Sequence, residues 1–454
     1  MGWHCSAETK SIALPGAIKH IEDVKGKPAI KADVALIDAN AWARGRHMVG
    51  ANPPCRVARG LVELILATGA TEAGIFWDTP SVMGPWRAAV QAERAAASRS
   101  TKPPATAEDM ATVTAKTMGS TCWEAVLNNP ETKAAAYALV WRCLTEEIAA
   151  RAPESLVVTL TDPGGGPAWT FPADAGDTPA VVATTANRYG EADAQVVVTA
   201  ATTINRAVAA GKPVPKIAVF TIDTDMALQL MGIWPRNVTV VWAKVVATAK
   251  RIHRTQTTAA KTEPHEPTRP MWEVVDCNAM VAPRQQMVSR MLWCLLAKGV
   301  DYCKGICKYG WTQQKLVTSM AERGSGLVEI TPGGAAVDLG LLRKILKAPG
   351  NRSAGRRLET AGKPGGGAEG IAGEMDRVLF CLRYYMWFDG TRPGWGGPEE
   401  LPNGVASPGG TVSDWVAGGP DRIELTDHHP VALPALDPAA AHPADAEALR
   451  HYLS

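Results

Sequence analysis

Acidic residues follow short apolar runs at several places along this 454-residue chain. Three such pairs are Asp38 after 33–37, Asp78 after 72–77 and Asp223 after 216–222. Buried carboxylates are costly and repel one another, so the natural partner of a group of them is a cation. All-oxygen ligands favour hard ions such as Mg²⁺ or Mn²⁺. Two such ions side by side activate water and offset charge during phosphodiester hydrolysis.

Alternating strands and helices must position these acids. The apolar runs predict strands at 33–37, 72–77, 155–160, 216–222 and 238–243, and helical spacing predicts helices at 57–68, 191–201 and 285–299. This alternation favours an α/β fold with a mostly parallel sheet flanked by helices. Functional groups in such sheets gather at the carboxyl ends of the strands, so we expect these acids to share one site.

Four further acids extend the set: Glu191, Asp193, Asp225 and Asp301. Glu191 and Asp193 open the helix predicted at 191–201, where carboxylates suit the first turn. Asp225 follows Asp223 by two positions, and Asp301 follows the helix at 285–299. Each of these acids, taken alone, is also typical of a turn or a helix N-cap. The signal for a metal site is the complete set.

The overall composition fits a large folded core, because 46% of the residues are hydrophobic and only 20% are charged. The net charge of +2 does not by itself indicate a nucleic-acid-binding protein. Nine scattered cysteines predict reduced thiols. Neither a signal peptide nor an apolar run long enough for a membrane span is visible, so we expect an intracellular protein, nuclear or cytoplasmic, with no membrane partner.

The composition changes near residue 346, after which Gly and Pro become frequent. We therefore expect a first domain at 1–345 and a Gly/Pro-rich extension at 346–454 with one helix near 375–388. Within the first domain, we expect an N-terminal part at 1–135, an internal part at 181–345, and inserted segments at 136–180 and 243–270.

Six motifs, in order, resemble those of the flap endonuclease and XPG family of 5′ nucleases. They are Met1-Gly2, Asp33–Asn40, Gly74–Pro80, Gly190–Gln195, Phe220–Met226 and Leu292–Cys303. The resemblance covers about residues 1–320. It implies a PIN-like fold with a helix–two-turn–helix element near 300–318, and structure-specific cleavage of DNA at 5′ flaps, junctions or 5′ ends with two Mg²⁺ ions, which Mn²⁺ can replace.

The resemblance also implies roles for nine residues. Asp38, Asp78, Glu191 and Asp193 would centre one metal ion, and Asp223, Asp225 and Asp301 the second. Arg87 and Arg94 lie where the family places basic residues that contact the scissile phosphate.

Some positions depart from the family pattern. Thr79 replaces the usual glycine, and the segment Lys304–Gly310 keeps only part of the glycine-rich hairpin. Trp42 is the nearest candidate for the aromatic residue that stacks on a base at the cut, although it is out of phase, and Arg44 lies close by.

Two other functions stay open: a ribonuclease on the same fold, and a binding or scaffold protein with weak or no turnover. The C-terminal residues show no clamp-binding peptide, and the sequence does not give the oligomeric state.

Overall fold

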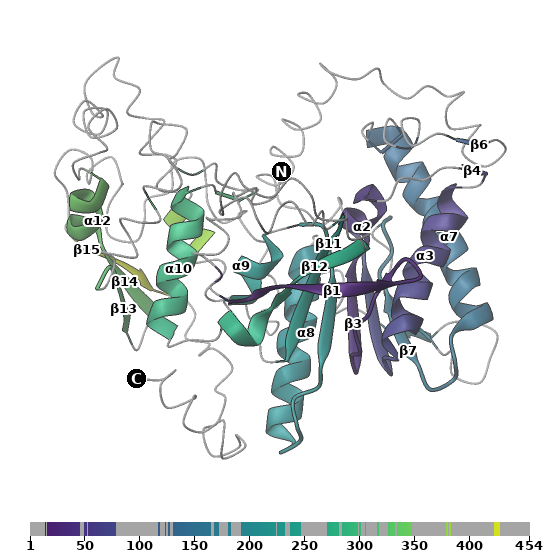
Figure 1. The fold of residues 1–454 in the computed structure, drawn as a ribbon, viewed down its shortest axis with the longest axis horizontal. Coiled ribbons are helices and arrows are strands. Elements are labelled where there is room, and N and C mark those ends of the chain that lie inside the picture. Colours follow the sequence, from purple (N-terminus) through teal and green to yellow (C-terminus); the bar gives the residue numbers. More distant parts are fainter. Residues whose placement is uncertain are drawn as a thin grey trace, which may run out of the picture.

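A computed structural model gives the fold, and it describes a defined set of residues. These are 14, 16–45, 50–51, 53–78, 117–118, 123, 126–127, 130–164, 168–171, 180–182, 192–223, 225–231, 237–246, 270–280, 284–297, 299–300, 305, 316, 326–331, 334–346, 378–379, 381–382 and 422–426. Within them the chain is a mixed α/β structure with a large central sheet flanked by helices (Figure 1).

Ten described strands form the central sheet in the order β2-β1-β12-β11-β10-β3-β5-β7-β8-β9. Their bounds are β1 Ile18–Val24, β2 Lys27–Pro28, β3 Val34–Asp38, β5 Glu72–Phe76, β7 Val157–Leu160, β8 Ala168–Phe171, β9 Ala180–Val182, β10 Ile217–Phe220, β11 Val238–Val246 and β12 Pro270–Asp276. The five central strands, β11-β10-β3-β5-β7, pair in parallel, and the strands at both edges pair antiparallel. The parallel centre confirms the α/β prediction.

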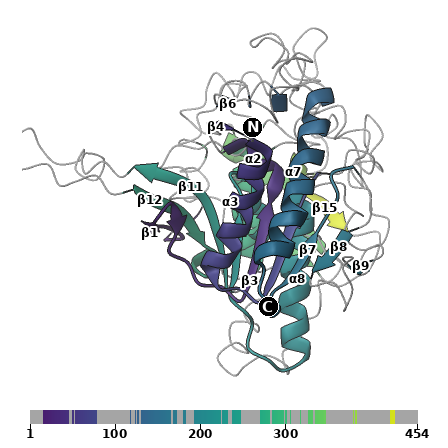
Figure 2. The ribbon, with the colours of Figure 1, turned by 90° about the vertical axis from the view of Figure 1, so that its right-hand side faces the viewer.

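Helices cover both faces of this sheet (Figures 1 and 2). They are α2 Ala39–Gly45, α3 Pro53–Thr68, α7 Pro130–Arg151, α8 Ala192–Ala209, α9 Met226–Met231 and α10 Arg284–Ala297, with a 3₁₀ turn at Cys277–Met280. Successive residues of β3 point to opposite faces, so Leu36 belongs to a core with α8, α9 and α10, and Ile37 to a second core with α2, α3 and α7. β3 is therefore buried on both sides, as its continuous apolar run predicts.

A smaller sheet lies at the other end of the molecule from α3 and α7 (Figure 1). It is formed by β13 Val328–Thr331, β14 Gly334–Asp338 and β15 Arg422–Thr426, next to the helix α12 Leu339–Leu346. A further two-stranded pair joins β4 Gly50–Ala51 to β6 Thr117–Met118. Strand β15 comes from the segment that we expected to be a Gly/Pro-rich extension.

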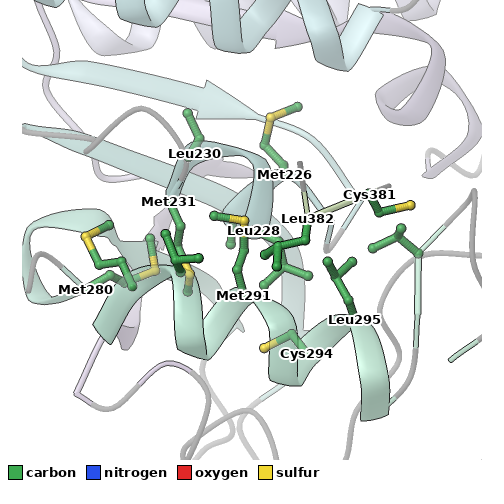
Figure 3. Close-up of a cluster of buried hydrophobic side chains, with 14 of the residues drawn as sticks. Met226, Leu228, Leu230, Met231, Met280, Met291, Cys294, Leu295, Cys381 and Leu382 are labelled. Atoms are coloured by element: carbon green, nitrogen blue, oxygen red, sulfur yellow. The ribbon is translucent and has the colours of Figure 1, made fainter. Parts of the chain in front are cut away.

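Residues 378–379 and 381–382 also join the main body. The described members of this turn are helical and fully buried, and Figure 3 shows Cys381 and Leu382 among side chains of α9 and α10. These residues belong to the apolar stretch where we expected a helix near 375–388, and the rest of that stretch lies outside the described residues. Residues 136–180, named above as an inserted segment, contribute most of α7 and the strands β7 and β8.

The prediction of reduced thiols is wrong for one pair of cysteines. Cys55 of α3 and Cys143 of α7 form a disulfide with their Cα atoms 5.1 Å apart. Because α3 and α7 pack side by side (Figure 2), two thiols far apart in sequence meet at their interface. Among the other described cysteines, Cys277, Cys294 and Cys381 are buried and keep reduced thiols, as predicted. No described helix is long and apolar enough to cross a membrane.

Candidate acidic site

Three of the predicted acids lie at one edge of the central sheet. Asp38 ends β3, Asp78 lies two residues beyond the end of β5, and Asp223 lies three residues beyond the end of β10. The strand order β10-β3-β5 is parallel throughout, so all three carboxyl ends point the same way. The sheet therefore places Asp38 between the other two, as the apolar runs predicted.

Asp38 is buried and accepts hydrogen bonds at both carboxylate oxygens. The Ala41 amide donates to Oδ1 at 3.0 Å, and the Thr221 hydroxyl donates to Oδ2 at 3.0 Å. The first bond caps the N-terminus of α2. Asp38 therefore has the capping role that the sequence allowed for each acid taken alone. The second bond ties the end of β3 to the end of β10.

The electrostatics of Asp38 show which acids are its neighbours. Burial raises the pKa of this carboxyl well above its usual range, and the charge of Asp78 raises it further. The Ala41 amide lowers the pKa, whereas Asp193 and Asp223 add to the upward shift. Four acids from four separate elements thus share one electrostatic environment, which we call the acidic cluster: Asp38, Asp78, Asp193 and Asp223.

Asp78 connects the end of β5 to the start of α8. Its Oδ1 accepts a hydrogen bond from the Ala192 amide at 3.1 Å, in the first turn of that helix. A carboxylate at a helix N-terminus is stabilised by the free amides and by the helix dipole. The bond fixes the first turn of α8, and with it Asp193, beside the strand ends.

Asp193 is held in place by Gln229. The Gln229 amide donates from its Nε2 to Asp193 Oδ2 at 2.6 Å. Gln229 belongs to α9, which follows Asp225 directly and is buried along its whole length. The Asp225 amide in turn donates to Asp223 Oδ1 at 3.1 Å, which closes a tight turn between β10 and α9. Asp225 itself is buried and lies next to the cluster.

The remaining predicted site residues lie outside the described residues. They are Arg87, Arg94, Glu191 and Asp301. Among the residues described, no three His, Cys, Asp or Glu side chains lie close enough together to hold a metal ion. The chemistry of the described donors still suits Mg²⁺, because the cluster offers only carboxylate oxygens and a buried acid whose charge would be offset by a cation.

Trp42 does not have the position that base stacking would need. Its indole is 4% exposed, stacks on Trp272 with ring centroids 5.8 Å apart, and meets Phe220 edge-on at 5.9 Å. The helical turn after Asp38 directs this residue into the core. The suggestion that Trp42 stacks on a base is therefore wrong.

Tyr137 of α7 is a neighbour of the cluster that the sequence did not identify. Its ring packs on Trp77 with centroids 4.9 Å apart, directly before Asp78. Burial raises the pKa of Tyr137 to about 12; Arg44 lowers this pKa, and Asp78 and Asp38 raise it. No sequence pattern marks Tyr137, because it lies in an Ala-rich stretch without a motif. Thr221 and Gln229, by contrast, could have been found as polar neighbours of the Asp-x-Asp segment.

Comparison with known proteins assigns neither a family nor a function to the chain. The chain matches no protein-family model and no curated protein sequence. The family resemblance therefore stays a prediction that rests on the motifs and on the arrangement of the acids.

Proposed function

We propose that the chain is a metal-dependent nuclease that hydrolyses phosphodiester bonds, with a PIN-like fold and a substrate of DNA flaps, junctions or 5′ ends. The observation that supports this most is the acidic cluster. Four carboxylates, at the ends of β3, β5 and β10 and in the first turn of α8, share one electrostatic environment at the carboxyl edge of a parallel sheet. Carboxylates that repel one another in a buried place are stabilised by a cation.

The roles of the site residues are those that the family resemblance implies. Asp38, Asp78 and Asp193, together with Glu191, would hold one Mg²⁺, and Asp223, Asp225 and Asp301 the second. Two bound ions would lower the pKa of a water and offset the charge that develops on the phosphate. Thr221 and Gln229 orient Asp38 and Asp193 through their hydrogen bonds. Arg87 and Arg94 would contact the scissile phosphate.

The first prediction concerns Asp223. Replacing Asp223 by Ala should abolish Mg²⁺-dependent cleavage of a labelled 5′-flap DNA, because it removes one of the proposed metal ligands. The matched control is Asp33→Asn at the opposite end of β3, where Asp33 accepts a hydrogen bond from the Lys216 amide at 2.8 Å. The control should cut normally. Undiminished cutting by the Asp223 variant would overturn the assignment.

The same assay separates the two other functions. Single strands, duplex ends, flaps and hairpins, each made in both DNA and RNA, would show a ribonuclease by preference for the RNA set. A binding or scaffold protein has one observation in its favour, namely that no three described acids lie close enough to hold an ion. It would bind these substrates without cutting any of them in Mg²⁺ or Mn²⁺.

A further inference from the structure

Three links join α3 to α7 where the two helices pack side by side (Figure 2). From the start of α3 onward they are one disulfide and two ion pairs: Cys55–Cys143, Arg59–Glu147 and Glu63–Arg151. Each partner lies about one helical turn after the previous one on its own helix, so α3 and α7 run in the same direction. The three links define the register of α7 on α3, and only the first of them is covalent.

The two ion pairs are the weaker links. Arg59 lies 3.1 Å from Glu147, and Arg151 lies 3.2 Å from Glu147 and 3.5 Å from Glu63. The Arg59 side chain is 60% exposed, and ion pairs open to water contribute little to stability. Buried apolar side chains of both helices keep α3 and α7 together without the disulfide. The disulfide is therefore the link whose chemistry can change the register without separating the helices.

Cys55 and Cys143 line a surface pocket between the two helices. Its volume is about 560 Å³, a size typical of small-molecule sites. The charged residues that line it are two arginines and three glutamates: Arg59, Arg151, Glu63, Glu146 and Glu147. A small zwitterionic thiol carries carboxylate and ammonium groups, which are the partners that guanidinium groups and carboxylates bind. The pocket thus joins a disulfide to a lining that suits a thiol of this class.

The disulfide is also connected to the acidic cluster through direct contacts. α3 leads from the carboxyl side of β3 back to the amino end of β5, so its first turn, with Cys55, lies toward the carboxyl edge of the sheet. On α7, Tyr137 lies less than two turns before Cys143, and its ring packs on Trp77 with centroids 4.9 Å apart. Trp77 directly precedes Asp78 of the acidic cluster. A shift of α7 would therefore reach an acid of the cluster through one ring contact.

We propose that the pocket between α3 and α7 is a modification site for a small zwitterionic thiol of the glutathione class, and that thiol exchange at the Cys55–Cys143 disulfide regulates the acidic cluster. In the oxidised chain, the disulfide holds α7 in the register that packs Tyr137 on Trp77. In the reduced chain, the ion pairs and apolar contacts alone hold this register, so the support of Trp77 is weaker. The regulation rests on the proposed nuclease function, whereas the modification site does not.

The exchange begins at Cys55, which is half-buried, whereas Cys143 is buried. The thiolate of the small molecule forms a bond to Cys55 Sγ, the bond between Cys55 and Cys143 breaks, and Cys143 leaves as a thiolate that takes a proton from water. A second small thiol then attacks the small-molecule sulfur of this mixed disulfide and releases Cys55. Two small thiols are oxidised to their disulfide, and the two cysteines are reduced to thiols by the same two electrons.

Mass spectrometry of the full native chain tests the modification site. Reduced glutathione is added, and free thiols are trapped with iodoacetamide at intervals. The first product should carry glutathione on Cys55 and the alkyl group on Cys143. Arg59→Ala combined with Arg151→Ala should slow this step about tenfold, because complementary charge raises association rates by at least that order. The same variant should react normally with 2-mercaptoethanol, which has no charge for the arginines to bind.

Hydrogen exchange and cleavage test the regulation. Reduction should speed amide exchange of residues 130–143 about tenfold, because opening the loop frees states that the bond excludes, and should change residues 144–151 less. Cleavage of a 5′-flap DNA in Mg²⁺ should fall about tenfold, since small misplacements of reacting groups lower rates by up to about a hundredfold. Oxidised glutathione should restore both properties. Cys55→Ser with Cys143→Ser should keep the reduced behaviour in either buffer.

Glu147→Gln tests whether the ion pairs hold the register once the disulfide is open. Glu147 pairs with both Arg59 and Arg151, so the variant weakens both ionic links. It should cut normally while oxidised and lose about a further threefold on reduction, the effect of an exposed ion pair. Glu72→Gln is the matched control, because Glu72 pairs instead with Arg206 of α8 at 3.9 Å. This control should behave like the wild type in both redox states.

The outcomes separate this inference from the nuclease assignment. A wild-type chain that never cuts contradicts the nuclease function and its regulation, whereas a glutathione adduct on Cys55 still supports the modification site. A chain that cuts equally well in both redox states overturns the regulation alone. A first adduct on Cys143, or arginine variants that react more slowly with both thiols, overturns the pocket as the site of exchange. A native disulfide that glutathione leaves intact overturns the whole inference.

Discussion

Asp38 is at once the cap of α2 and the centre of the acidic cluster. Its hydrogen bonds to the Ala41 amide and the Thr221 hydroxyl stabilise the ionised form, whereas burial and three neighbouring acids disfavour it. The unfavourable effects prevail, since the pKa is raised. The folded chain without metal therefore holds this charge at a cost in stability, and a divalent cation would remove that cost.

The cost of holding the Asp38 charge predicts how the stability of the fold depends on pH. A carboxyl whose pKa is raised on folding binds its proton more tightly in the folded chain than in the unfolded one. Its stabilising effect is thus fully present below the unfolded pKa of about 4 and is lost as pH rises through the folded pKa. In EDTA, Asp38→Asn should gain stability relative to the wild type as pH rises above about 4.

Denaturant unfolding at a series of pH values measures this difference. Asn keeps an acceptor for the Ala41 amide, so the cap of α2 is largely preserved. Asp338→Asn is the control, because Asp338 also caps a helix, through the Leu341 amide at 2.6 Å, and lies in another part of the fold. A difference between Asp38→Asn and the wild type that does not change with pH would contradict the prediction.

At the level of elements, the strands that carry the site were predictable and the edges were not. β3, β5 and β10 are buried on both faces, and this leaves continuous apolar runs in the sequence. β1 is polar and half-exposed at one side of the sheet, so its residues Ile18–Val24 give no such run. β12 was likewise missed, because its apolar residues follow a polar, Pro-containing stretch.

The residues of the site also fall into those that could be predicted from the sequence and those that could not. The acids could be predicted because each follows a strand or opens a helix. Arg44 could be noticed only as a neighbour of Asp38, and Tyr137 could not be noticed at all. Tyr137 reaches the cluster because α7 packs along α3 and brings its N-terminal half beside Trp77. Such tertiary contacts between distant segments leave no local pattern.

The disulfide between α3 and α7 is a second contact of this kind. It joins residues 88 positions apart and encloses Asp78 and the start of α7 in one loop. Both cysteines line a surface pocket between the two helices, so a small reductant can reach them. The disulfide therefore links α3 covalently to α7, the helix that carries Tyr137.

Reduction should destabilise the chain. Opening a loop of this length is expected to cost about 2–4 kcal/mol, because the unfolded chain regains the freedom that the bond removed. Unfolding of the wild type with and without dithiothreitol measures the cost, and Cys55→Ser with Cys143→Ser should match the reduced chain. The buried thiols of Cys277, Cys294 and Cys381 should resist alkylation in the native state. Mass spectrometry that finds Cys55 alkylated without reduction would contradict the pairing.

At the scale of the whole molecule, the C-terminal segment is part of the core that lies behind the site. One core, on the α8 face of the sheet, extends from β3 through α9 and α10 to residues 378–379 and 381–382. Figure 3 shows Leu382 between Leu228 of α9 and Leu295 of α10. α9 also carries Gln229, which holds Asp193, so packing against the C-terminal segment supports the geometry of the acidic cluster.

Leu382→Ala tests this connection. Leu382 is fully buried, so its truncation should cost about 2–5 kcal/mol through lost burial and the cavity left behind. Denaturant unfolding measures the loss, and Val157→Ala on the exposed side of β7 is the control, because Val157 is 42% exposed. Cleavage activity should fall with the same variant under conditions where it stays folded, since α9 and Gln229 would lose support. A Leu382 variant as stable as the control would show that Leu382 does not belong to the core.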